Sequence, residues 1–271
     1  MPEITLPQGT IRYRDVGDGP SLVFVHGALV DGRLWEPVVD RLEGHRCIVP
    51  DLPLGSHRTP LRPDADLTPT GLAQLIADFL GALDLEDVTL VGNDTGGALC
   101  QLVVTRHPKR VGRLVLTNCD AFDNFPPKAF RGLVFAARAH LLTAAMQPVR
   151  LPAARRLPIA YGWLAARIPD ELLEAWVEPF LSDRHVRRDT RRVFAGVDRG
   201  LLLDTAARLR EFDRPVLIAW APEDRFFPLD HAHRLAAIFP DARLVEVPGS
   251  RTFISLDQPE RLAALIREHA D

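Results

Sequence analysis

The sequence is poor in several features, and each shortage narrows the choice of function. Only three cysteines occur, Cys47, Cys100 and Cys119, and their spacing matches no metal-binding motif. We predict that they are buried small hydrophobic side chains without a disulfide or a redox role.

No apolar run approaches the ~20 residues that a bilayer-spanning helix needs. The first ten residues, MPEITLPQGT, lack the charged start and apolar core of a signal peptide. We therefore expect a cytoplasmic protein.

Charge of one sign is also scarce. The formal net charge is -3, and no long run of acidic or basic residues occurs. This pattern predicts neither a nucleic-acid partner nor a membrane partner. With 46% hydrophobic and 25% charged residues, the chain is typical of one large globular domain, or of one domain with an insert. A small molecule is the expected partner, no cofactor is indicated, and either a monomer or a homodimer is compatible with the composition.

Short apolar runs alternate with helical patterns along most of the chain. The clearest helix spans 68–83, where Thr68 can cap and Pro69 takes the first helical position. The expected strands, most of them buried on both faces, are 21–26, 46–51, 88–92, 113–118, 215–220 and 242–247. Strand–helix–strand alternation predicts an α/β fold with a mostly parallel sheet covered by helices on both faces.

The alternation stops between 121 and 205, where no strand is expected and prolines separate several helical patterns. The sequence thus predicts a core made of residues 1–120 and 206–271, with 121–205 as a helical insert. Because the insert leaves from the end of one strand and returns before the next, it should lie over the carboxyl edge of the sheet. A mostly apolar insert there is typical of a cap over a binding site, and the alternative is a satellite hydrophobic core.

One turn stands out, in the stretch LVGNDTGGAL. Gly92 and Gly96 flank Asp94 in the pattern Gly-x-nucleophile-x-Gly, with a buried strand before it and an apolar helix after it. On such a strand-to-helix turn, the central residue is held in a strained, exposed conformation. The helix start also offers free N–H groups and the positive end of its dipole.

Together with this turn, three other segments carry a family resemblance. They are His26-Gly27-Ala28-Leu29 after the first long strand, PDLPLGSHRTP after the second, and WAPEDRFFP after the fifth. The chain resembles the α/β-hydrolase superfamily. An aspartate at the turn resembles the branch that contains haloalkane dehalogenases, fluoroacetate dehalogenases and epoxide hydrolases. The resemblance implies an α/β-hydrolase fold with a helical cap, acting through an alkyl-enzyme ester.

The resemblance also implies roles for individual residues. Asp94 would be the nucleophile, and the backbone N–H groups of Thr95 and of Ala28 or Leu29 would form the oxyanion hole. Asp224 fits the supporting acid of the triad, and its alternative is a solvated loop carboxylate.

Other residues complete this expected site. Asp120 and Asp123 occupy an alternative acid position, and they can equally cap the first helix of the insert. His26 and Gly27 belong to the oxyanion loop, where His26 is expected to be structural. Asn93, beside the nucleophile position, is counted with the binding residues.

The sequence departs from the family at its end. Thr252, in PGSRTFI, stands where the family places its catalytic histidine. A carboxylate needs no base to attack an alkyl carbon, but releasing the resulting ester requires water activated by an imidazole. Threonine cannot supply that base. His57, in the loop after the second long strand, is the preferred substitute, and a histidine bonded to backbone is the alternative.

Three functions therefore stay open from the sequence. The first is an enzyme of this fold that acts on a small, largely apolar molecule with Asp94 as nucleophile. The second is a lyase, isomerase or cyclase in which Asp94 is a general acid or base, since desolvation and neighbouring carboxylates would raise its pKa. The third is a binding protein that has lost catalysis. The apolar side chains of 121–205 predict a largely apolar pocket in each case.

Overall fold

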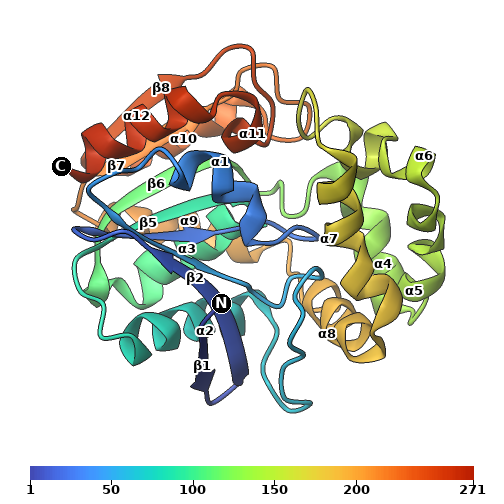
Figure 1. Cartoon of the computed structure of the whole chain (residues 1–271). Coiled ribbons are helices and arrows are strands. Elements are labelled where there is room, and N and C mark those ends of the chain that lie inside the picture. The colour runs from blue at the N-terminus through green and yellow to red at the C-terminus, as the bar shows by residue number, and fades with distance from the viewer.

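One eight-stranded sheet runs through the computed structural model, which describes all 271 residues (Figure 1). The strands are β1 (Glu3–Leu6), β2 (Gly9–Val16), β3 (Ser21–Val25), β4 (Arg46–Pro50), β5 (Val88–Asp94), β6 (Val111–Cys119), β7 (Val216–Trp220) and β8 (Ala242–Glu246). Their order is β1-β2-β4-β3-β5-β6-β7-β8. From β4 to β8 all neighbours are parallel, whereas β1 and β2 add an antiparallel edge. The predicted mostly parallel sheet is confirmed.

All six predicted strands are present, but the two strands of the edge hairpin were not anticipated. In β2, Ile11 and Tyr13 are buried while the residues between and around them are partly exposed. Such alternation is the pattern of an antiparallel strand with one solvated face, and it contains no continuous apolar run. A search for strands buried on both faces therefore misses this hairpin.

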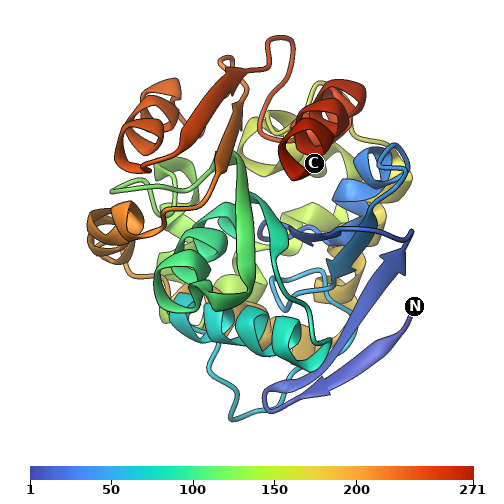
Figure 2. The ribbon, with the colours of Figure 1, turned by 90° about the vertical axis from the view of Figure 1, so that its left-hand side faces the viewer.

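Helices cover both faces of the sheet, as Figure 2 shows when the sheet is seen along its edge. The helices of the core are α1 (Glu36–Val39), α2 (Pro69–Ala82), α3 (Thr95–Arg106), α9 (Leu201–Arg208), α10 (Leu229–Ile238), α11 (Ile254–Asp257) and α12 (Pro259–Ala270). Helices α1 and α12 pack on one face, and α2, α3, α9 and α10 lie on the other. The predicted helix at 68–83 is α2, where the Thr68 hydroxyl accepts a hydrogen bond from the backbone N–H of Gly71 (3.2 Å). None of the helices combines the length and apolar character that crossing a membrane requires.

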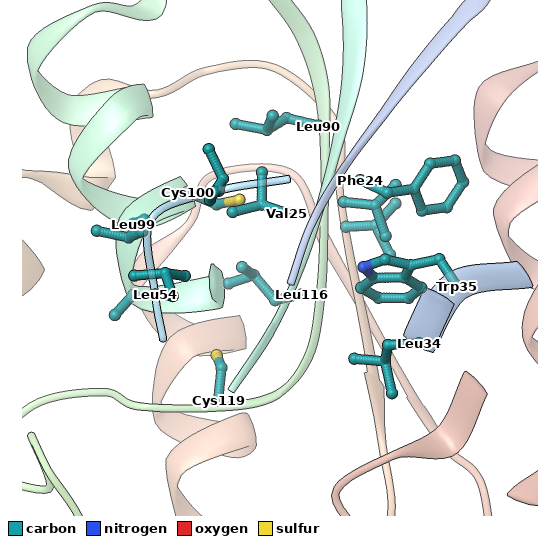
Figure 3. Packing of buried hydrophobic residues seen from close by; sticks show 14 of the residues in the cluster. Phe24, Val25, Leu34, Trp35, Leu54, Leu90, Leu99, Cys100, Leu116 and Cys119 are labelled. Carbon is teal, nitrogen blue, oxygen red and sulfur yellow. The ribbon is translucent and has the colours of Figure 1, made fainter. Parts of the chain in front are cut away.

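Buried hydrophobic side chains pack on both sides of β3 and β5, at the centre of the sheet (Figure 3). On one face Phe24 packs against Trp35, with ring centroids 5.3 Å apart. On the other face Leu99 and Cys100 of α3 lie against the strands. All three cysteines are buried and free, as the sequence predicted.

A helical segment separates β6 from β7 and contains no strand. We propose to treat residues 121–205 as the cap of the molecule, although its last residues, 201–205, begin α9, which packs against α3 in the core. Its helices are α4 (Arg131–Arg138), α5 (Leu142–Ala145), α6 (Pro152–Arg155), α7 (Asp170–Ser182) and α8 (Arg184–Ala195). In Figure 1 they form a layer at one end of the sheet, beside the carboxyl ends of the parallel strands.

Buried polar contacts fasten the cap to the core. The indole N–H of Trp176 in α7 donates to Asp31 (3.0 Å). Asp189 in α8 is fully buried, accepts a hydrogen bond from the backbone N–H of Leu61 (2.8 Å), and lies 3.5 Å from the Nε2 atom of His57. A buried carboxylate destabilises a protein unless neighbouring groups pair with its charge or donate hydrogen bonds to it.

Replacing Asp189 by alanine should destabilise the protein strongly, because the N–H of Leu61 and the Nε2 atom of His57 would be buried without the carboxylate that they contact. The expected loss is about 3 kcal/mol in the free energy of unfolding, measured by urea denaturation. Asp170→Ala is the control, since the ion pair of Asp170 with Arg156 is exposed and should contribute less than about 1 kcal/mol. Equal losses for the two variants would contradict this assignment.

Candidate active site

The turn between β5 and α3 places Asp94 at the carboxyl edge of the sheet. Strand and helix follow one another directly, and Asp94 has φ 52° and ψ −130°. A positive φ is strained for a residue with a side chain. At Gly96 a Cβ atom would lie 2.3 Å from the carbonyl oxygen of Val25, and at Gly92 it would lie 2.7 Å from the Sγ atom of Cys100. The two glycines are therefore required by the packing around the turn.

The loop after β3 approaches the Asp94 carboxylate closely. The backbone N–H of Ala28 donates to the Oδ2 atom of Asp94 (3.1 Å), and the N–H of Thr95 also donates to this carboxylate. A Cβ atom at Gly27 would come within 2.1 Å of the same Oδ2 atom. The N–H of Leu29 is already used, because it donates to the carbonyl oxygen of Leu54 (2.9 Å). Of the two candidates for the second oxyanion donor, the geometry favours Ala28.

His26 holds this loop in place. The backbone N–H of Leu52 donates to its Nε2 atom (2.9 Å), so the Nδ1 atom carries the proton and donates to the carbonyl oxygen of Gly27 (2.9 Å). Burial lowers the pKa of His26 to about 4, which keeps the ring neutral. These contacts fit the structural role expected for His26.

A second carboxylate lies next to Asp94. Asp120 is buried at the end of β6, and its Oδ2 atom accepts a hydrogen bond from the Thr95 hydroxyl (3.3 Å). Its Oδ1 atom is buried without a partner. Burial, followed by the charge of Asp94, holds the pKa of Asp120 well above its usual range. Neither Asp120 nor the exposed Asp123 caps a helix of the cap, because no side-chain cap is formed at the start of α4 or of the turn before it.

Asp224 contacts Thr252 at the position where a triad would contain histidine. The Thr252 hydroxyl donates to the Oδ2 atom of Asp224 (2.8 Å), and the Oδ1 atom accepts from the backbone N–H groups of Phe226 and Phe227. Burial raises the pKa of Asp224 to about 6, despite these hydrogen bonds. Asp224 is thus not a solvated loop carboxylate, and Thr252 is fully buried.

Asn93 and Asn118 connect the strand ends beneath the site. The Asn93 amide donates to the hydroxyl of Thr117 (2.9 Å) and to the carbonyl oxygens of Asn118 (3.1 Å) and Thr252 (2.7 Å). Asn118, which the sequence analysis did not select, exchanges two hydrogen bonds with the backbone of Ala221. A polar residue at the end of a buried strand was the signal that could have identified it.

His57 is directed toward the cap. It is fully buried, its Nδ1 atom accepts a weak hydrogen bond from the N–H of Gly55 (3.4 Å), and its Nε2 atom faces Asp189. His57 does not line the cavity that contains Asp94. These contacts fit a histidine that is bonded to its surroundings better than a base that substitutes for the missing catalytic histidine.

A cavity of about 300 Å³ lies between the cap and the core, and Asp94 is the only charged residue that lines it. Fifteen of its 21 lining residues are hydrophobic, and most of them come from the cap. Tyr161, another lining residue, donates its hydroxyl to the carbonyl oxygen of Leu29 (2.7 Å) and so ties the cap to the oxyanion loop. Neither Asp120, Asp224 nor Thr252 reaches the cavity wall.

Burial raises the pKa of Asp94 to about 7, and the charge of Asp224 adds to this effect. The N–H groups of Thr95 and Ala28 act in the opposite direction, because they stabilise the charged form. The net result is a carboxyl group that holds its proton up to neutral pH, beside an apolar cavity.

Comparison with known proteins identifies the family. Residues 22–265 match the model of the alpha/beta hydrolase family, so the chain belongs to that family. The chain is 29% identical to an uncharacterised protein of Mycobacterium tuberculosis, over 96% of this chain and 77% of that protein. It is 28% identical to the 2-hydroxy-6-oxononadienedioate/2-hydroxy-6-oxononatrienedioate hydrolase 2 of Pseudomonas putida, over 86% of this chain and 82% of that enzyme. An alpha/beta hydrolase fold protein from Burkholderia ambifaria superposes with a TM-score of 0.84 at 24% identity, covering 98% of this chain and 97% of that structure.

The raised pKa of Asp94 predicts a pH-dependent difference between the wild type and Asp94→Asn. The unfolded carboxyl titrates near 3.8 and the folded one near 7, so the folded state binds the proton more tightly. The stability that this proton gives the wild type is present below pH ~4 and is lost as the pH rises to ~7. Relative to Asp94→Asn, the wild type should lose on the order of 1–3 kcal/mol between pH 4.5 and pH 8.

Urea denaturation of both proteins across this pH range measures the difference. A difference that does not change with pH would show that the pKa of Asp94 is the same in the folded and unfolded states.

Proposed function

We propose that the protein is an enzyme for a small, largely apolar substrate and that Asp94 is the group that reacts with it. One observation carries this proposal: a single carboxyl group, and no other acidic or basic side chain, lies in the wall of a largely apolar cavity. Binding energy in such a cavity comes from apolar contacts, and one polar group sets the chemistry. The strained turn at Asp94 supports a reacting role, because such strain is typical of functional sites.

Proton transfer is the chemistry that fits this site best. A carboxyl group whose pKa is about 7 is present in both protonation states at neutral pH, as a general acid or base requires. Asp120, whose pKa is raised well above its usual range by burial and by the charge of Asp94, accepts a hydrogen bond from the hydroxyl of Thr95, the residue next to Asp94. No imidazole is needed for this chemistry, which agrees with Thr252 at the histidine position. The reaction class would be that of an isomerase, a lyase or a cyclase.

Covalent attack by Asp94 is the second candidate, and the contact with Ala28 favours it. An alkyl ester formed on Asp94 would keep its carbonyl oxygen at the N–H of Ala28, where a developing oxyanion is stabilised. Hydrolysis of that ester would then lack a base, because Asp224 is bonded to Thr252 and His57 faces Asp189. The ester would therefore persist instead of turning over.

Deuterium exchange tests the proton-transfer proposal directly. Small apolar ketones such as acetophenone and 2-cyclohexenone, incubated with the protein in D₂O, should exchange hydrogen next to the carbonyl faster than in buffer. Asp94→Asn should reduce this protein-catalysed rate by about 100-fold or more, the typical contribution of a general base. Asp123→Asn is the matched control, because Asp123 is exposed and does not line the cavity.

Intact mass measurement with alkyl halides, epoxides and activated esters separates the alternatives. A stable adduct that forms on the wild type but not on Asp94→Ala would show that Asp94 attacks the substrate covalently, and the proton-transfer proposal would then fail. In that case Thr252→His, which places an imidazole beside Asp224, should release the adduct. If neither exchange nor an adduct is found, while ligands still bind in the cavity, the protein is a binding protein and both candidates fail.

A further inference from the structure

Basic residues gather in one part of the cap, although the whole chain has a net charge of -3. Between residues 124 and 169 there are seven lysines and arginines and no aspartate or glutamate. Only Arg156 of these seven forms an ion pair within the molecule, with Asp170 just outside the segment. The others are Lys128, Arg131, Arg138, Arg150, Arg155 and Arg167. Residues 124–169 therefore carry an excess of positive charge, and the next acidic residues along the chain lie in the neighbouring helix α7.

The same segment carries most of the large apolar side chains that face solvent. Of the seven in the molecule, five lie between residues 124 and 169, and they are 49% to 71% exposed. They are Phe135, Leu141, Leu151, Leu157 and Ile159. They belong to α4, α5, α6 and the turns around them, which form the end of the molecule that lies away from the sheet (Figure 1). Exposed apolar side chains gathered in one region mark an interaction surface.

This surface is also the entrance to the cavity. Sixteen of the 21 cavity-lining residues belong to 124–169. Leu157 and Ile159 both line the cavity and are exposed to solvent, so they lie at its mouth. A ligand that reaches Asp94 by this route passes between apolar side chains of the cap.

We propose that residues 124–169 of the cap dock onto the surface of an anionic lipid bilayer, so that the mouth of the cavity opens toward the membrane. Exposed phenylalanine and leucine side chains would enter the headgroup region, and the arginines would contact the lipid phosphates. A second copy of the chain is the less suitable occupant, because two surfaces of the same positive charge would repel. The expectation of no membrane partner came from the charge of the whole chain, which averages out this local excess.

Co-sedimentation with vesicles tests the proposal. The wild type should bind vesicles of equal parts phosphatidylglycerol and phosphatidylcholine at low salt, and should bind pure phosphatidylcholine vesicles far less. Arg150→Glu/Arg167→Glu should weaken binding by at least ~25-fold, because each positive charge removed costs about fivefold and the added glutamates repel the anionic surface. Phe135→Ser/Leu151→Ser, which leaves the cavity wall intact, should also weaken binding.

Two controls lie outside the surface. Arg261→Glu changes an exposed arginine on α12, and Leu203→Ser changes an exposed leucine on α9. Both should bind vesicles as the wild type does. Asp94→Asn should do so too, which separates this proposal from the role of Asp94.

Three results would overturn the proposal. The first is no binding to either kind of vesicle, and the second is equal binding to anionic and neutral vesicles. The third is concentration-dependent self-association of the wild type without vesicle binding, abolished by Phe135→Ser/Leu151→Ser, which would assign the surface to a second copy of the chain.

Discussion

The contact between the Asp94 carboxylate and the loop after β3 is the interaction on which the site depends. It requires a residue without a side chain at Gly27, where a Cβ atom would come within 2.1 Å of the Oδ2 atom. It also requires Gly96, since the first turn of α3 packs directly against the carbonyl oxygens of Val25 and His26. His26, bonded to Leu52 and Gly27, fixes the loop at this distance. The glycines and the neutral histidine thus serve one purpose, which is to hold a carboxylate at two backbone N–H groups.

Burial of carboxyl groups without a cation then sets the chemistry. Charged carboxylates are costly in a poorly solvated site, so burial raises the pKa of Asp94 to about 7, that of Asp224 to about 6 and that of Asp120 well above its usual range. Thr252 donates one hydrogen bond to Asp224 and brings no ring that could activate water. The arginines of the cap lie outside, and none lines the cavity. This environment supports the proposal of a neutral, apolar substrate.

Particular residues show how far the sequence could predict this structure. The parallel strands, the helix capped by Thr68 and the turn at Asp94 follow local rules of pattern and capping, and they are found where expected. The edge strand containing Ile11 and Tyr13 was missed because it alternates between buried and partly exposed residues and contains no continuous apolar run. The partner of His57 could not be foreseen, because Asp189 lies 132 residues further along the chain and meets it only when the cap folds over the core. The basic residues of 124–169 lie in one stretch of the sequence, but the charge of the whole chain hid this cluster, and the exposure of the apolar side chains among them is known only from the fold.

The central claim is that Asp94 is a carboxyl group poised to gain or lose a proton at neutral pH in an apolar cavity. Titration of the side-chain carboxyl carbons of ¹³C-labelled aspartate by NMR tests it most directly, with the Asp94 resonance assigned by its loss in Asp94→Asn. The account predicts a midpoint near pH 7 for this resonance. A midpoint near ~3.9, the value of an ordinary solvated aspartate, would contradict it.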